Sequence, residues 1–133
     1  MILSAAKPEY RVSVDAPDTI DPVVFVTHLT FKFPRTSVST TSATSCGSFA
    51  KASKRSASIL AQITQGSAYQ VGRYLVIHDG TTVTTIEESA VATGSMLGTF
   101  EGVINGDDVE FRVTMSSSSS ATVTTKIDTI SIP

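Results

Sequence analysis

The segment with the clearest structural signal in this chain is Leu75-Val-Ile-His-Asp-Gly-Thr-Thr-Val-Thr-Thr-Ile-Glu-Glu-Ser89. Apolar and β-branched residues, which are typical of strands, lie on both sides of Asp79-Gly80. Asp and Gly both tolerate the positive φ angles of a two-residue type I′ turn, and Asp79 can also hydrogen-bond its own backbone. The segment therefore predicts two antiparallel strands joined at Asp79-Gly80.

Period-2 alternation of apolar and polar residues recurs on both sides of this hairpin. Before it, the alternation runs over 57–64 and again over 69–77, with a turn at 65–67 between them. After it, Asn105-Gly106 predicts a second hairpin turn, and 109–115 alternates again. Seven or more short strands of this kind predict an all-β fold, an antiparallel β-sandwich of jelly-roll-like topology.

The N-terminal part has a different pattern. A short strand is predicted around Tyr10, and 23–33 alternates so that one face carries Phe25, Leu29, Phe31 and Phe33. Pro34 ends this strand, and 35–48 is rich in Ser and Thr without periodicity, which predicts a loop or linker. We therefore expect two parts: residues 1–45 as N-terminal strands or an arm, and residues 46–133 as the sandwich.

Composition excludes several classes of function. The 133 residues are 41% hydrophobic and 17% charged, with a net charge of −2 that does not favour binding to nucleic acid. No apolar run is long enough to span a bilayer, and Met1-Ile-Leu is too short for a secretory signal. Cys46 is the only cysteine, so an intramolecular disulfide is impossible. We expect a soluble protein with no nucleic-acid or membrane partner.

The candidate catalytic groups do not form a site in the sequence. His78 and Asp79 are adjacent, and neighbouring strand residues point to opposite faces of a sheet. Asn105-Gly-Asp-Asp108 lacks the ligand spacing of an EF-hand calcium loop. The basic cluster at 51–55 has no aromatic partners for stacking on bases. We predict no catalytic, cofactor-binding or metal-binding residues, no cofactor and no enzyme activity, and we assign Asp79, Gly80, Asn105 and Gly106 to structural turns.

A series of short motifs resembles a known module. These motifs are His78-Asp-Gly-Thr-Thr82, Gly94-Ser-Met-Leu-Gly-Thr-Phe100, Asn105-Gly106 and Val109-Glu-Phe-Arg-Val-Thr114. In this order they resemble a β-sandwich module of tailed-phage virion proteins, notably those of cyanophages, over about residues 49–133. The resemblance implies a non-enzymatic structural component, made in the host cytoplasm and carried in the virion, whose partners are other capsid or tail subunits.

The resemblance does not assign a place in the particle. Because the chain is short and has no repeats, we expect a capsid decoration or cement protein that stabilises the shell through symmetric contacts. The alternative is a tail-fibre, tail-tip, baseplate or connector component, with Tyr69 and Tyr74 as aromatic contacts for a host-surface glycan. A free-standing carbohydrate-binding module stays open as a second class.

Symmetric assembly implies a homo-oligomer, and a trimer is expected by analogy. The protein-interface candidates are the apolar residues of the N-terminal part, which serve either a neighbouring subunit or an enlarged core: Tyr10, Phe25, Leu29, Phe31 and Phe33.

Overall fold

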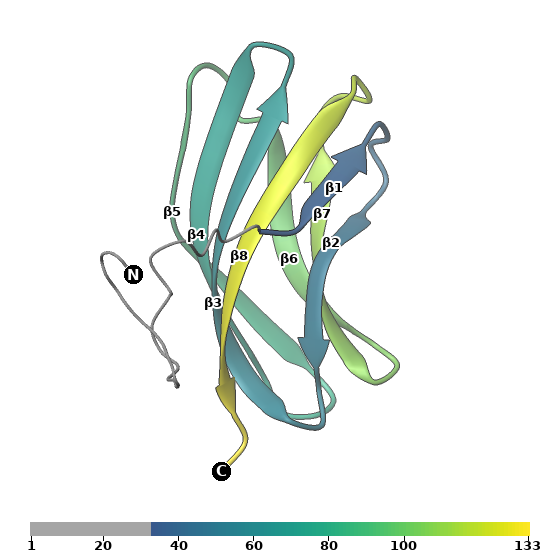
Figure 1. The fold of residues 1–133 in the computed structure, drawn as a ribbon, viewed down its shortest axis with the longest axis vertical. Coiled ribbons are helices and arrows are strands. Elements are labelled where there is room, and N and C mark those ends of the chain that lie inside the picture. Colours follow the sequence, from purple (N-terminus) through teal and green to yellow (C-terminus); the bar gives the residue numbers. More distant parts are fainter. Residues whose placement is uncertain (1–32) are drawn as a thin grey trace, which may run out of the picture. The chain divides into compact units, whose positions relative to one another are not determined.

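The computed structural model of the protein describes residues 33–133, which form eight β-strands (Figure 1). These strands are β1 (Arg35–Val38), β2 (Thr44–Ala50), β3 (Lys54–Gln65), β4 (Ala68–His78), β5 (Val83–Ala92), β6 (Gly98–Asn105), β7 (Asp108–Met115) and β8 (Ala121–Ser131). Of the interface candidates, four lie outside the described residues: Tyr10, Phe25, Leu29 and Phe31.

The strands form two antiparallel sheets that pack face to face, so the predicted β-sandwich is confirmed. One sheet has the order β1-β8-β3-β4-β5 and the other has the order β2-β7-β6. The pairing of β1 with β8 and of β2 with β7 is nested as in a jelly roll. The consecutive hairpins β3-β4-β5 remain in the same sheet (Figure 1).

The core lies between the sheets and follows the predicted alternation. Ala57, Ile59, Ala61 and Ile63 of β3 are all buried, and so are Val109, Phe111 and Val113 of β7. Tyr74, Phe100 and Phe111 form an aromatic cluster at the centre, with ring centroids 5.0–5.3 Å apart. Apolar burial of this kind supplies most of the free energy that holds two sheets together.

The predicted loop at 35–48 is wrong, because β1 and most of β2 lie within it. Both are edge strands, and in 35–48 only Val38 and Cys46 are buried, so the apolar alternation that marks a strand is missing. Around Gly47 the register of β2 against β7 also shifts, which breaks the period of two further. The sandwich therefore begins at Arg35 and not at residue 46.

The hairpin at Asp79-Gly80 is confirmed, but its loop is longer than predicted. His78 pairs with Val83, so the loop contains the four residues 79–82 and not two. Gly80 has φ = 99°, and the Asp79 amide donates to the carbonyl oxygen of Thr82 at 3.2 Å. Thr81 and Thr82 belong to the loop because the Asp79 carboxylate binds them there.

Candidate functional site

His78 is a structural residue of the β4–β5 hairpin. Its side chain is buried, with Nε2 2.6 Å from the carbonyl oxygen of Lys54 and Nδ1 accepting from the Gly80 amide at 3.0 Å. These two contacts fix the neutral tautomer that carries its proton on Nε2. Both ring nitrogens are thus occupied by backbone groups, which leaves neither available to a metal or a substrate.

Asp79 organises the loop through its carboxylate. The two oxygens accept hydrogen bonds from the amides of Thr81 and Thr82 and from both threonine hydroxyls, at 2.8–3.0 Å. These hydrogen bonds stabilise the charged form and hold the pKa of Asp79 far below its ordinary value of 3.8. Asp79 and His78 do not contact each other through their side chains, and the turn role predicted for Asp79 and Gly80 fits this geometry.

The other hairpin turn has the same structural character. Gly106 has φ = 62° between β6 and β7, where Asn105 pairs with Asp108. The Asn105 amide donates to Glu110 at 2.8 Å, and Arg112 forms an ion pair with the same carboxylate at 2.8 Å. These hydrogen bonds lower the pKa of Glu110. Within residues 33–133, no three His, Cys, Asp or Glu side chains come close enough to hold a metal ion.

Cys46 and Tyr74 are buried, and Arg55 of the basic cluster supports the β4–β5 hairpin. Burial raises the pKa of the Cys46 thiol to about 12, and its Sγ donates to the carbonyl oxygen of Phe111. Burial likewise raises the pKa of the Tyr74 phenol, which hydrogen-bonds Glu87 at 3.3 Å. In the basic cluster, Arg55 donates to the carbonyl oxygen of His78 and therefore supports the hairpin.

An apolar patch lies on the outer face of the five-stranded sheet. Its members belong to β3, β4, β5 and β8, and each side chain is 36–68% exposed: Leu60, Leu75, Ile77, Ile86 and Ile130. Register places them as neighbours, because Leu75 pairs with Ile86, and Ser56 lies between Ile77 on one side and Ile130 on the other. We call these five residues the outer apolar patch.

Four residues of the outer apolar patch line a groove of about 530 Å³: Leu75, Ile77, Ile86 and Ile130. Its floor includes the small residues Ser56 and Ser58 of β3, and its walls are Leu75 and Ile77 on one side and Ile130 on the other. Exposed apolar surface is often used for contacts with other molecules, so the outer apolar patch is a candidate interaction surface of the described residues.

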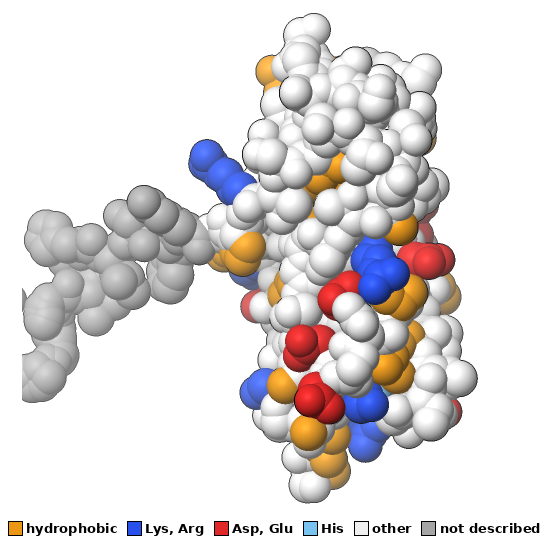
Figure 2. All heavy atoms as spheres, turned by 90° about the vertical axis from the view of Figure 1, so that its right-hand side faces the viewer, with side chains coloured by type: hydrophobic (Ala, Val, Ile, Leu, Met, Phe, Trp, Pro, Cys, Tyr) orange, Lys and Arg blue, Asp and Glu red, His pale blue; other side chains and the backbone are white. Residues whose placement is uncertain are grey.

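The outer face of the three-stranded sheet is different. Figure 2 looks at the molecule from the side of β2 and β7, and acidic and basic side chains gather there over the lower half. The charged residues on this face alternate along β6 and β7 with the residues of the core: Glu101, Glu110 and Arg112. This face carries the polar exterior expected of a solvated sheet, which makes the outer apolar patch the exception.

The alternation in β4 correctly divided its residues between two faces of the strand. It did not show which of these faces points into the core. One predicted face carries Tyr69, Val71, Arg73, Leu75 and Ile77, and all of these except the half-buried Val71 are exposed. The buried face carries Gln70, Tyr74, Val76 and His78. The expectation that Tyr74 contacts a glycan is therefore wrong, because its side chain is fully buried in the aromatic cluster. Sequence reasoning missed Leu75 and Ile77 as interaction candidates. The presence of apolar residues on both faces of this strand was the signal that could have identified them.

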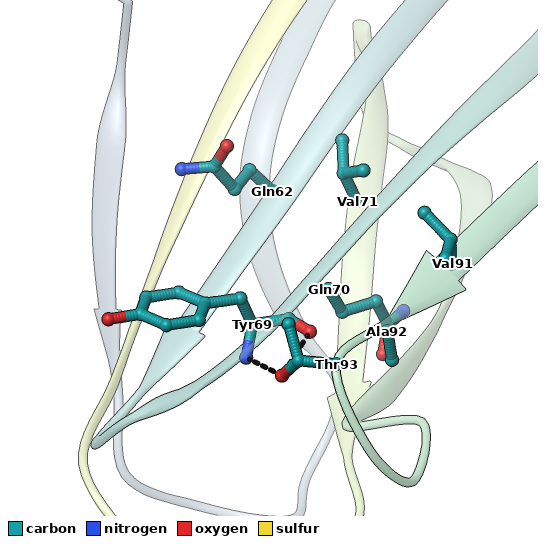
Figure 3. Close-up of a pocket in the computed structure, with 7 residues that line it drawn as sticks. All are labelled: Gln62, Tyr69, Gln70, Val71, Val91, Ala92 and Thr93. Carbon is teal, nitrogen blue, oxygen red and sulfur yellow. Dashed lines mark hydrogen bonds between the residues drawn. The ribbon is translucent and has the colours of Figure 1, made fainter.

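Tyr69 lies at the other end of this face, beside a shallow depression shown in Figure 3. Its ring is 48% exposed, and the Gln62 side chain projects from the neighbouring strand β3. The Tyr69 backbone is held to Thr93, whose hydroxyl accepts from the Tyr69 amide at 3.1 Å. An exposed aromatic ring next to an amide is an arrangement that can contact a sugar.

A comparison with solved structures finds a similar fold in part of a phage tailspike protein. The tailspike protein of Acinetobacter phage vB_ApiP_P1 has a similar fold, with a TM-score of 0.55 and 14% identity over 84% of this chain and 24% of the tailspike. The tailspike of Acinetobacter baumannii phage AM24 gives a TM-score of 0.40 and 9% identity over 78% of this chain and 27% of the tailspike. The chain thus spans about a quarter of the length of the tailspikes it matches.

The match to the first tailspike shows a shared fold. No protein-family model matches the chain, and no curated protein matches it. The described residues contain no helix that is long and apolar enough to cross a membrane.

Proposed function

We propose that this chain is a non-enzymatic structural component of a tailed-phage particle and that it belongs to the tail. Two independent observations support the proposal. The motifs between His78 and Thr114 resemble a virion module, and the fold is similar to part of a phage tailspike. The fold similarity carries the choice of the tail over the capsid shell, because the matched structure is a tail protein.

The outer apolar patch is the surface by which this component would assemble. The subunits of a particle must remain in contact with one another. Burial of apolar surface between subunits stabilises such contacts in water. We expect a homo-oligomer, with a trimer as the first candidate, whose subunit contacts bury Leu75, Ile77 and Ile86. Assembly would also stabilise a chain that lacks disulfides, because binding that favours only the folded state shifts the folding equilibrium.

Glycan binding is a second candidate function, favoured by one observation. Tyr69 is an exposed aromatic residue beside the Gln62 amide, whereas the other aromatic proposed for this role, Tyr74, is buried. A Tyr69→Ala variant should then reduce binding to host cells, while Val103→Ala, on the outer face of the other sheet, should not. Equal adsorption by Tyr69→Ala and the unmodified protein would exclude this role.

The location of the chain in intact particles tests the main proposal. Purified virions, sedimented through a density gradient, should carry the protein, and a particle map should place a few copies at the tail. Hundreds of copies spread over the shell would instead identify a capsid decoration protein. Absence from the particles would contradict both roles and leave a free-standing binding module.

The non-enzymatic part of the proposal has its own test. Both ring nitrogens of His78 are hydrogen-bonded to the backbone, so we expect no hydrolysis when the protein is incubated with surface polysaccharide of the host. Release of oligosaccharides that is lost in Glu87→Gln or Asp128→Asn would overturn this expectation.

A further inference from the structure

Four hydroxyl-bearing side chains form a row across one end of the five-stranded sheet, on its outer face. Ser37 of β1 pairs with Thr122 of β8. Thr122 also pairs with Thr64 of β3, and Thr64 in turn pairs with Tyr69 of β4. In each of these strands the adjacent residue is buried, so the four side chains point away from the core. We call these four residues the hydroxyl row.

The hydroxyl row connects two shallow depressions of similar size. One has a volume of about 260 Å³ and is the depression beside Tyr69 that Figure 3 shows. The other has a volume of about 270 Å³ and is lined by the remaining three members of the row, Ser37, Thr64 and Thr122. Because Thr64 and Tyr69 are cross-strand partners, they form the border between the two depressions. The depressions therefore adjoin, and one continuous ligand can contact both.

The chemistry of the two depressions suits a sugar chain. The first combines the exposed Tyr69 ring with Val71, Val91 and the Gln62 amide. The second is lined mainly by hydroxyl groups, and neither depression is lined by a charged residue of the described part of the chain. A pyranose has an apolar ring face, which packs on an aromatic ring, and hydroxyls, which hydrogen-bond to protein hydroxyls and amides. Ring packing and neutral hydrogen bonds are thus the contacts that this surface offers.

The position of Tyr69 is fixed through its backbone. Its amide donates to the Thr93 hydroxyl at 3.1 Å, and its carbonyl oxygen accepts from the Thr93 amide at 2.9 Å. Figure 3 shows the ring pointing away from Thr93 and Ala92, on the same side as Gln62 of β3. The ring is therefore in place before a ligand binds, which lowers the entropic cost of binding.

The spacing of the strands sets the length of ligand that this surface accommodates. Neighbouring strands of a sheet are about 4.8 Å apart, so a row that extends from β1 across β8 and β3 to β4 is about 14 Å long. A pyranose ring is comparable in width to one strand spacing. A chain that reaches from Ser37 to Tyr69 therefore contains roughly three sugar units.

We propose that the hydroxyl row and its two depressions form one binding track for an oligosaccharide of about three linked sugar units, which crosses the strands. One sugar ring packs on Tyr69, and the units toward β1 hydrogen-bond to the hydroxyls of Thr64 and Thr122. This inference rests on the glycan-binding candidate function above. It adds that the ligand is a stretch of a polysaccharide chain and not a single terminal sugar.

The dependence of affinity on chain length tests the proposal with the full-length protein. Oligosaccharides of one to six sugar units are cut from the surface polysaccharide of the host by partial acid hydrolysis, separated by size and titrated into the protein in a calorimeter. The dissociation constant should fall with each added unit up to about three or four units, the length of the track, and stay constant for longer chains.

A double variant tests which residues bind the added units. Thr64→Val/Thr122→Val removes two hydroxyls but keeps β-branched side chains, which favour strands, so the fold should be retained. The affinity for a tetrasaccharide should fall about tenfold, as expected for two neutral hydrogen bonds, while the affinity for a single sugar unit should not change. Tyr69→Ala should weaken binding at every length, and Val103→Ala, on the outer face of the other sheet, should leave it unchanged.

The outcomes separate this inference from the candidate function on which it rests. If a single sugar unit binds as tightly as the longer chains, the protein has a glycan site but not the extended track. If the double variant binds the tetrasaccharide as tightly as the unmodified protein does, the hydroxyl row takes no part in binding, which also overturns the inference. If no oligosaccharide of any length binds, the glycan-binding function is wrong as well.

Discussion

His78 shows how a residue that suggests catalysis can serve packing. Its imidazole joins β3 to the β4–β5 loop through Lys54 and Gly80, and the ring is almost completely buried. We expect His78→Ala to lower the free energy of unfolding by about 2–3 kcal/mol, because two buried backbone groups lose their partner. Urea denaturation measures this loss. A change below about 0.5 kcal/mol, as is usual for exposed sites, would contradict the structural role.

Asp79 should make stability depend on pH. Hydrogen bonds from Thr82 and Thr81 hold its pKa below the ordinary value of 3.8, so the folded state binds this proton more weakly than the unfolded state does. The resulting stability is complete above the unfolded pKa and is lost as the pH falls toward the folded pKa. The unmodified protein should therefore be more stable than Asp79→Asn at pH 7, and the difference should shrink below about pH 4.

Urea midpoints of both proteins, measured at several pH values, check this dependence. Asp107→Asn, an exposed acid in the other hairpin turn, is the matched control. If the difference in urea midpoint between the unmodified protein and Asp79→Asn stays constant down to pH 3, the charge of the Asp79 carboxylate does not stabilise the loop.

Cys46 should be unreactive while the protein is folded. Its thiol is buried against Phe111, and burial raises its pKa to about 12, so almost no thiolate forms at pH 8. A thiol reagent should label Cys46 only after denaturant is added, with one equivalent per chain. Labelling of the folded protein on the time scale of mixing would place Cys46 at an accessible surface instead.

At the scale of elements, the sequence predicted strands where one face is buried. β3 and β7 were found because apolar residues occupy every second position. β1 and β2 were missed because edge strands bury few side chains, and Ser and Thr supply their remaining positions. Periodicity also cannot tell which face of β4 points inward, since the choice depends on what packs against it. The outer apolar patch therefore emerged only from the assembled sheet.

Gly72 makes a further prediction about β4. A Cβ atom at this position would lie 2.5–2.9 Å from the ring and hydroxyl of Tyr74, two residues along on the same face. Gly72→Ala should displace Tyr74 from the aromatic cluster and lower stability by about 1–3 kcal/mol, the usual cost of overpacking. Gly94→Ala, in a loop where a Cβ atom meets nothing within 4 Å, is the control. Thermal unfolding of both variants measures the difference, and equal midpoints would contradict the close packing.

At the scale of the whole molecule, the two outer faces have opposite character, and this asymmetry predicts how the protein associates. Replacing Leu75 and Ile86 with Ser removes a cross-strand pair from the outer apolar patch, at a cost of about 1 kcal/mol in stability because both side chains are exposed. The variant should nevertheless lose most of its self-association, since the apolar contact area is what drives it.

Sedimentation at matched concentrations measures this loss, and Val103→Ser on the polar face of the other sheet is the control. A Leu75→Ser/Ile86→Ser variant that assembles as well as the control would show that subunits meet elsewhere. Assembly would then have to use the charged face formed by β6 and β7, and its strength should fall steeply with added salt. Two results together would assign assembly to the apolar face. The oligomer of the unmodified protein should persist at high salt, and the double variant should not form it.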